Sequence, residues 1–357
     1  MTGTRQAMAE YRLTEVGSNP PSMARAMHGL AARSPFSFLR RGLEVASELA
    51  WCELQDRLMP LRGGLSRVEA GHAARQGNSL ALYLHWSPDG RVSAMVLRQL
   101  ALWRDCGFDV VFVSNAAPPP PDWAAVADHT VLRLQRANVG RDFGAWRDAA
   151  AEALRHLPEP TELLLANDSV LGPFLPLAPL VACWRSGGDG LFGMTESLGG
   201  GAHLQSYALL ARGAGPVATM LAHLRAFRDH RSKWRVVQSG ELGLTRRMLA
   251  AGHRCAALFG YPALCALVDP ATRQSLGPRF AEAAALGRYP LNPTHHLWRV
   301  LVERMGFPYL KTELVRRNPG RLPGVTEWPS LVPATEATLI REHLSIMAGA
   351  RLQPAPG

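Results

Sequence analysis

Polar side chains follow directly after an apolar run in the middle of the sequence. Residues 163–166 read Leu-Leu-Leu-Ala, and Asn167, Asp168 and Ser169 come next, shortly before a Gly-Pro break. A short apolar run bounded by turn residues is typical of a buried strand. In open α/β sheets, ligands bind at the carboxyl ends of the strands. We therefore predict that a strand presents the Asp168 carboxylate to a ligand; the alternative is a helix or turn cap.

A second polar cluster lies in residues 136–146, which read RANVGRDFGAW. The glycines let the backbone approach a ligand, and Asp142 can cap the helix that follows. Arg141 stands beside the positive end of that helix. We predict a pyrophosphate site made by Asn138, Gly140, Arg141 and Asp142, with a glycine turn, a capping acid and a surface arginine as the alternative.

Further acids and a histidine occur after the next predicted strand. That strand, 190–194, is followed by Glu196, and a glycine-rich loop then leads to His203 and Gln205. Glu196 and Asp168 would lie at the same kind of sheet edge, where carboxylates and phosphate oxygens hold a hard cation. We predict a divalent cation, Mg²⁺ or Mn²⁺, at this place.

Glu241 opens the predicted helix 239–252. A carboxylate in the first helical turn is stabilised by the helix dipole, which is one interpretation of its position. The other interpretation is that Glu241 faces the ligand crevice and takes a proton from an incoming hydroxyl group.

Alternating strands and helices must position these residues. The strands are nearly continuous apolar runs, which favours an α/β fold with a Rossmann-type, mostly parallel sheet flanked by helices on both faces. The predicted strands are 79–85, 109–114, 130–134, 163–166, 190–194 and a short one at 234–238, and the predicted helices are 92–106, 123–127, from Asp142 to about 156, 174–185, 215–228 and 239–252. No GxGxxG motif follows the first strand, which disfavours an ordinary dinucleotide site.

Segments outside the sheet complete the predicted organisation. Residues 36–62 have apolar side chains at helical spacing, which predicts an amphipathic helix that either packs on the main domain or lies on a membrane surface. Helices are also expected at about 295–305 and at 335–347, and a strand or helix at 309–315. The predicted units are a poorly ordered leader 1–35, an amphipathic helical segment 36–77, a catalytic domain 78–258, a C-terminal extension 259–323 packed on it, and a helical tail 324–357.

Composition narrows the class of protein. The 357 residues are 47% hydrophobic and 19% charged, and they contain five cysteines without a CxxC pair. This indicates a globular cytosolic protein with reduced thiols, either soluble or peripheral at the inner membrane. The net charge of +10 suits phosphates or anionic lipids, but the basic residues form no stripe with aromatic residues, so we expect no nucleic acid partner.

Six segments in register resemble the rhamnan synthesis protein F family, over about residues 78–320. They are NVGRDFGAW (138–146), LLLANDSVLGPF (163–174), LFGMTES (191–197), HLQSY (203–207), GELGLTRRMLAAG (240–252) and NPTHHLWRVLVERMGFPYLKTELVRRNP (292–319). The resemblance implies a GT-A-like glycosyltransferase of bacterial surface polysaccharide assembly, with O-antigen and lipopolysaccharide as examples of such products. It also implies a nucleotide-sugar donor, with dTDP-rhamnose first, a glycan or lipid-linked glycan acceptor, and a divalent cation.

The resemblance also assigns roles to individual residues. Asp168 stands where such enzymes carry a metal-binding Asp-x-Asp motif, here reduced to Asn-Asp-Ser, and His295 would complete the metal shell or contact phosphate. Glu241 matches the acid that serves as the base in such enzymes. The implied catalytic residues are therefore Glu241 and Asp168. The implied donor-binding residues are Asn138, Gly140, Arg141, Asp142, Asn167, Glu196, His203 and Gln205. The alternatives are a non-catalytic assembly protein that keeps the fold and a membrane-surface adaptor working through residues 36–62.

Overall fold

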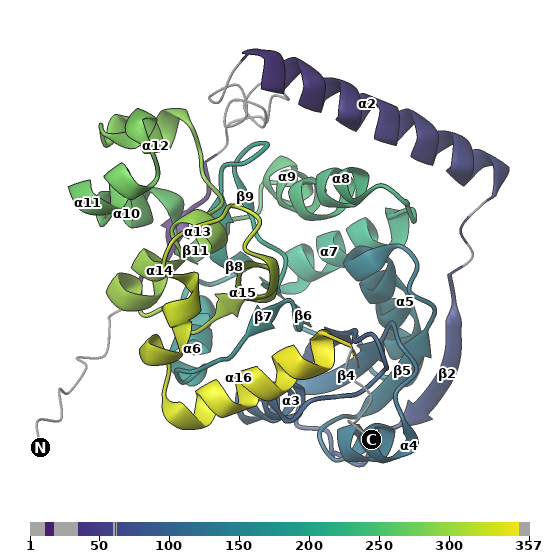
Figure 1. Cartoon of the computed structure of the whole chain (residues 1–357). Helices are drawn as coiled ribbons and strands as arrows, with labels where there is room; N and C mark the ends of the chain where they lie inside the picture. Colours follow the sequence, from purple (N-terminus) through teal and green to yellow (C-terminus); the bar gives the residue numbers. More distant parts are fainter. Residues whose placement is uncertain (1–10, 18–34, 60, 62, 350–357) are drawn as a thin grey trace, which may run out of the picture.

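A large central sheet organises the chain. The computed structural model describes residues 11–17, 35–59, 61 and 63–349 (Figure 1). Within these residues the sheet has the strand order β1-β11-β8-β10-β6-β3-β4-β5-β2, with β9 paired to β8. The strands are β1 (Thr14–Glu15), β2 (Leu65–Ala70), β3 (Ser79–His85), β4 (Asp109–Ser114), β5 (Leu132–Arg136), β6 (Glu162–Asn167), β8 (Gly190–Ser197), β9 (His203–Leu204), β10 (Ala208–Arg212) and β11 (Cys255–Phe259). The predicted α/β class with a mostly parallel sheet flanked by helices is thereby confirmed.

The direction of the strands decides which residues meet. Strands β3, β4, β5 and β6 pair in parallel, and β8 pairs in parallel with β11. Strand β10 lies between β6 and β8 and runs antiparallel to both, so β6 and β8 run in the same direction. The carboxyl ends of the six parallel strands and the amino end of β10 therefore lie at the same edge of the sheet.

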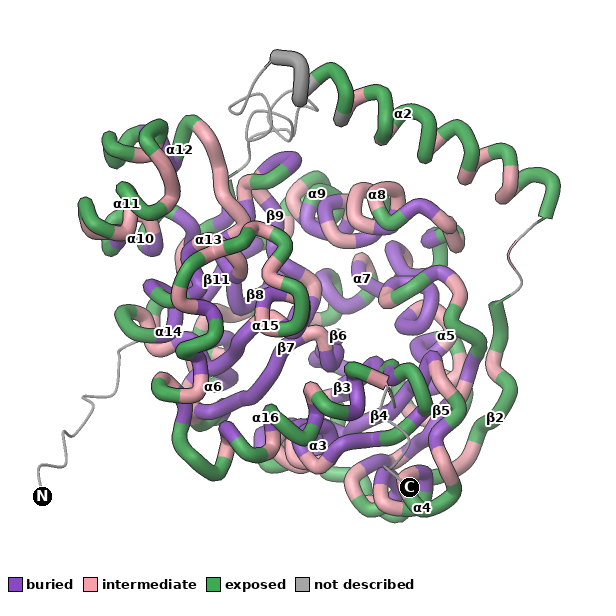
Figure 2. The backbone as a smooth tube through the Cα atoms, viewed as in Figure 1, coloured by how far each residue is buried: buried purple, intermediate pink, exposed green. Residues whose placement is uncertain are grey.

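Helices cover both faces of this sheet because its strands alternate their side chains. In β3, Leu80, Leu82 and Leu84 belong to one buried cluster, and Ala81 and Tyr83 belong to the other. The first face is covered by α5 (Arg141–His156), α7 (Ala214–Ala226) and α9 (Gly243–Ala250). The second is covered by α3 (Ala94–Asp105), α4 (Pro120–Ala127), α6 (Ala178–Ser186) and α10 (Tyr261–Ala266). Figure 2 shows the central strands of the sheet buried between these layers, whereas the edge strand β2 is largely exposed.

The C-terminal part of the chain wraps around the sheet edge. Strand β12 (Leu310–Lys311) pairs antiparallel with β7 (Val170–Leu171), which follows Asp168. The helices of this part are α11 (Pro270–Ser275), α12 (Ala284–Arg288), α13 (Pro293–His296), α14 (Trp298–Met305), α15 (Thr312–Arg317) and α16 (Ala334–Met347), with 3-10 turns at Pro278–Phe280 and Val325–Leu331. Helix α16 packs on α3, where His343 Nδ1 and Ser93 Oγ share a hydrogen bond of 2.8 Å.

The prediction of a short strand at 234–238 is wrong. These residues belong to α8 (Lys233–Val236) and to the π-helical turn η1 (Val237–Leu242), which run on into α9. Ser232 begins this helix because its side chain accepts a hydrogen bond from the Arg235 N–H, at 3.5 Å. A serine cap outweighs the β-branched and aromatic residues that suggested a strand.

The N-terminal predictions have a mixed outcome. Most of the predicted leader lies outside the described residues, but residues 11–17 are not poorly ordered, because β1 pairs with β11 and Val16 is buried. The helix predicted at 36–62 is confirmed as α2 (Pro35–Leu58). The segment to residue 77 is not all helical, since it contains β2, an edge strand paired with β5. Among the described residues, no helix has the length and apolar character needed to cross a bilayer.

Candidate functional site

A cleft of about 540 Å³ lies at the sheet edge where the parallel strands end. It brings together most of the predicted site residues: Asn138, Arg141, Asp142, Asn167, Asp168, Gln205, Glu241 and His295. Gly140 lines a smaller adjoining pocket of about 220 Å³. Residues from five separate segments of the sequence thus converge on one place.

Asp168 lines the cleft, immediately after β6. Its Oδ2 accepts a hydrogen bond of 2.9 Å from the Trp86 N–H, and its own N–H donates to the Leu84 carbonyl at 3.3 Å. Burial raises the pKa of Asp168 to about 7, although the Trp86 N–H partly opposes this shift. The carboxyl group can therefore take up and release a proton near neutral pH.

Asn167 connects the end of β6 to the start of α5. Its Nδ2 donates to Asp142 Oδ2 at 3.0 Å, and its Oδ1 accepts from the Ser169 N–H at 3.0 Å. The predicted capping role of Asp142 is wrong, because Gly140 is the N-cap residue and Asp142 lies in the first turn with its carboxylate on Asn167. Burial raises the pKa of Asp142, and the nearby charge of Glu241 adds to that rise.

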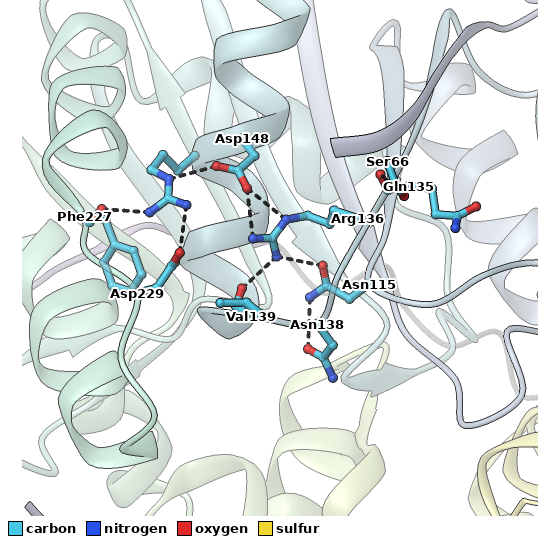
Figure 3. Close-up of polar contacts among 10 residues, drawn as sticks. Ser66, Asn115, Gln135, Arg136, Asn138, Val139, Asp148, Phe227 and Asp229 are labelled. Atoms are coloured by element: carbon cyan, nitrogen blue, oxygen red, sulfur yellow. Dashed lines mark hydrogen bonds and ion pairs between the residues drawn. The ribbon is translucent and has the colours of Figure 1, made fainter. Parts of the chain in front are cut away.

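A buried guanidinium fixes the loop before α5 (Figure 3). Arg136, at the end of β5, donates to Asp148 Oδ2 and Asn115 Oδ1, both at 3.0 Å, and to the Val139 carbonyl at 2.8 Å. Asn115 in turn donates to Asn138 Oδ1 at 3.4 Å. The loop that carries the predicted donor-binding residues is therefore held by contacts to two strands and a helix.

The backbone at the start of α5 has an unusual conformation. Gly140 has φ 71°, and a Cβ there would lie 1.8 Å from Asp229 Oδ1, so a larger residue would be strained and would displace the Asp229 side chain. Arg141 has φ 51°, a left-handed conformation that is costly for a residue with a Cβ and is found mainly at functional sites. Among the described residues, no side chain hydrogen-bonds as a cap at the start of α5, and Asp142 lies in its first turn, where the helix dipole favours negative charge.

Glu241 lies across the cleft in the turn η1. The sequence predicted Glu241 in the first turn of a helix. The structure places it further along, because the helix begins at Lys233. Its Oε2 accepts from the Ser206 N–H at 2.7 Å and from Ser206 Oγ at 2.6 Å, and its Oε1 lies 3.2 Å from His203 Nε2. Burial alone would raise the pKa of Glu241, but the bonds from His203 and Ser206 outweigh it and lower the pKa to about 2.

His203 and Glu196, both predicted to bind the donor, do not line the cleft. His203 is buried, with Nδ1 at 2.7 Å from the Gly201 carbonyl, and reaches the cleft only through Glu241. Glu196 accepts from the Tyr261 N–H at 3.0 Å at the start of α10. Strands β6 and β8 end at the same edge of the sheet, as expected for Asp168 and Glu196, but the reversed strand β10 lies between these strands and Glu196 does not line the cleft.

The sequence did not predict five charged residues that line the cleft, which are Lys233, Glu313, Arg316, Arg317 and Lys311. Lys311 has the most clearly defined contacts. Strand β12 carries it to the cleft, where its Nζ donates to Ser169 Oγ at 2.9 Å and lies 4.9 Å from the centroid of the Tyr207 ring. Burial lowers the pKa of Lys311, but the charges of Glu241 and Asp142 oppose that fall. The chain contains two lysines among its 39 basic residues, and both line this cleft, with Lys233 as the other. The scarcity of lysine in the sequence could therefore have drawn attention to these two residues.

The side chains present do not fit a divalent cation held by the protein. In the described part of the chain, no three His, Cys, Asp or Glu side chains are grouped to hold a metal ion. One Asp168 oxygen is bonded to the Trp86 N–H, and the positive charge of Lys311 acts on the same carboxylate. His295 lines the cleft, where burial lowers its pKa to about 4, so its imidazole is neutral. The other acids described in this cleft are already engaged, because Asp142 accepts from Asn167 and Glu241 accepts from Ser206. These carboxylates therefore do not form a donor set for Mg²⁺ or Mn²⁺.

Replacing Glu241 with glutamine should destabilise the folded protein. A carboxylate whose pKa falls from 4.5 to about 2 on folding contributes stability above pH 4.5, and this contribution is lost as the pH falls through about 2. We expect a loss of about 2 kcal/mol at pH 7 that shrinks toward pH 3, measured by urea unfolding at both pH values. The exposed Glu327→Gln is the matched control and should leave the unfolding midpoint nearly unchanged, and an equal loss there would contradict the assignment.

Comparisons with known proteins give relatives at low identity. No family model matches the chain. The chain is similar to the uncharacterized protein y4gN of Sinorhizobium fredii, with 28% identity over 200 residues that make up 53% of this chain and 52% of that protein. It is also similar to the virulence protein VirA of Vibrio anguillarum, with 29% identity over 222 residues, 58% of this chain and 67% of that protein. The chain thus spans about half the length of the first relative and about two thirds of the second.

Proposed function

We propose that this protein is a glycosyltransferase, which moves a sugar from a nucleoside-diphosphate donor to a hydroxyl group of a growing glycan. One observation carries the proposal. A carboxyl group with a pKa of about 7, Asp168, shares a cleft with the cations Lys311 and Arg141 and with the uncapped end of α5. Glycosyl transfer to a hydroxyl group needs both a base and positive charge in one site. The base accepts the proton of the hydroxyl group, and the positive charge stabilises the departing diphosphate.

The cationic side of the cleft suits the diphosphate. The transition state of glycosyl transfer places positive charge on the sugar ring and negative charge on the leaving group. Arg141 and Lys311 line the same cleft near the start of α5, and in this proposal they stabilise the negative charge of the departing diphosphate. No protein-held cation is needed for this role.

Asp168 is the better candidate for the base. The acceptor oxygen forms a bond to the anomeric carbon, the bond from that carbon to the diphosphate oxygen breaks, and the hydroxyl proton passes to a carboxylate. A base works best when its pKa is near the working pH, which describes Asp168 but not Glu241, with its pKa of about 2. Glu241, held by Ser206 and His203, would instead fix the wall of the acceptor side.

The identity of the substrates rests on the resemblance to the rhamnan synthesis protein F family. It makes dTDP-rhamnose the first donor to test and a lipid-linked bacterial surface polysaccharide the acceptor. The sheet, with six strands in one direction and β10 reversed among them, is compatible with the GT-A type of fold that the resemblance implies.

Donor turnover tests the proposal. The full chain is incubated with a panel of nucleotide sugars and lipid-linked glycan acceptors, with Mg²⁺, Mn²⁺ or EDTA, and the release of nucleoside diphosphate is followed. We expect one donor to be turned over, with EDTA reducing the rate by less than about threefold because Lys311 and Arg141 supply the charge. The control Arg155→Met, at the far end of α5, should turn over the donor at the same rate.

Two outcomes would contradict the proposal. Donor binding without turnover, with the acceptors supplied, would favour a non-catalytic assembly protein. A rate that depends on Mg²⁺ or Mn²⁺ would keep the glycosyltransferase but overturn the charge-stabilising role given to Lys311.

A further inference from the structure

Helix α2 presents its apolar side to solvent. The exposed fractions of Leu39, Leu43, Trp51, Leu54 and Leu58 are 63%, 65%, 61%, 47% and 72%. At 100° per residue, these five side chains fall within an arc of about 120° around the helix. Figures 1 and 2 show α2 at the periphery of the molecule with much of its length exposed. We call these five residues the apolar row.

The acidic side of α2 faces the body of the protein instead. Asp56 Oδ1 lies 2.5 Å from an Arg231 nitrogen, and Glu53 Oε2 lies 2.9 Å from Arg235 Nη2. Glu48 Oε1 accepts from Ser232 Oγ at 3.1 Å. An ordinary surface helix buries its apolar stripe and exposes its acids, so this orientation is the reverse of the usual one.

We propose that the apolar row of α2 binds the surface of an anionic lipid bilayer. Leucine and tryptophan side chains insert at the boundary between headgroups and acyl chains, and arginines beside them meet the lipid phosphates. Arg40 and Arg57 lie within the same arc of the helix, and the side chain of each is 75% exposed. The sequence places no acid in this arc, and Glu44 just outside it pairs with Arg40.

Charge argues against a second copy of the chain as the occupant. If two apolar rows packed face to face in antiparallel fashion, Arg40 of one helix would approach Arg57 of the other, and a parallel pair would bring identical arginines together. Like charges in such positions are destabilising. An anionic bilayer has the opposite charge, and the net charge of +10 of the whole chain acts in the same direction.

Vesicle binding tests this inference independently of the reaction. The full chain is sedimented with vesicles of phosphatidylcholine mixed with phosphatidylglycerol, and with vesicles of phosphatidylcholine alone. We expect binding to the anionic vesicles and a loss of at least about tenfold in partitioning for Leu43→Glu with Leu54→Glu. The matched control is Val68→Glu with Leu267→Glu, which changes two exposed apolar residues outside α2 and adds the same charge.

The results distinguish a lipid bilayer from a second copy of the chain as the partner of the apolar row. Retained binding by the control together with loss in the α2 variant supports the inference. Wild-type protein that ignores anionic vesicles overturns it, and so does an equal loss in both double variants, which would reflect charge alone. Sedimentation velocity that shows a dimer broken by Leu43→Glu with Leu54→Glu, without vesicle binding, would assign the row to a second copy.

Discussion

Replacing Asp168 with asparagine should abolish donor turnover and at the same time stabilise the folded protein. Asparagine keeps the oxygen that accepts from the Trp86 N–H but cannot take a proton from the acceptor, so turnover should fall at least about 100-fold. The stability gain follows from burial, which raises the pKa of Asp168 from 3.8 to about 7. Folding therefore favours the protonated carboxyl group.

The sign of the stability change depends on pH. Between pH 3.8 and about 7 the folded protein binds more protons at Asp168 than the unfolded chain does, so this residue destabilises the fold increasingly as the pH rises. Asp168→Asn should therefore be more stable than the wild type by up to about 3 kcal/mol at pH 8, and nearly equal to it at pH 4.

Thermal unfolding at the two pH values measures this gain. Asp105→Asn, which removes an exposed carboxylate at the end of α3, is the control and should show no pH-dependent gain. A variant Asp168→Asn that loses turnover but is less stable at pH 8 than at pH 4, relative to the wild type, would show that Asp168 is ionised in the fold. That outcome would contradict the raised pKa on which the choice of Asp168 as the base rests.

Lys311→Met should produce the other large effect. Methionine fills a similar volume beside Tyr207 but removes the ammonium group that we assign to the departing diphosphate. Turnover should fall about 100-fold, and donor binding measured by calorimetry should weaken about tenfold, because charge develops further in the transition state than in the bound donor.

Two further variants distinguish charge from packing at this position. Lys311→Arg keeps the charge and should recover part of the lost turnover, whereas Arg155→Met, an exposed cation on α5, should behave like the wild type. Rescue of Lys311→Met by added Mg²⁺ would support the idea that the lysine replaces a cation. Unchanged turnover in Lys311→Met would remove the lysine from the mechanism.

Local pattern was sufficient to predict much of the fold. The runs at 79–85 and 109–114 match β3 and β4, because buried parallel strands are continuous apolar stretches. The order of the strands in the sheet could not be predicted from local patterns. Acids at the ends of successive strands predicted that Asp168 and Glu196 reach the same kind of sheet edge, but the place of β10 between their strands depends on contacts that no local pattern encodes.

The residues of the candidate site were also predicted only in part. Asp168, Arg141 and Glu241 stand next to glycine or apolar signals, and the structure brings all three to one cleft. Lys311 lies far along the chain in a two-residue strand, whose pairing with β7 has no local signature. The pKa values of Asp168 and Glu241 also depend on burial and on hydrogen bonds, which only the folded chain creates.

The pairing of β12 with β7 sets the order in which the site can be completed. Asp168 lies in the turn between β6 and β7, near the middle of the chain, whereas the ammonium group of Lys311 arrives with a segment made more than a hundred residues later. Because chains emerge from the ribosome N-terminal end first, a nascent chain that has folded its sheet still lacks the cation beside its buried acid. The ammonium group of Lys311 is therefore a late addition to the cleft during biosynthesis.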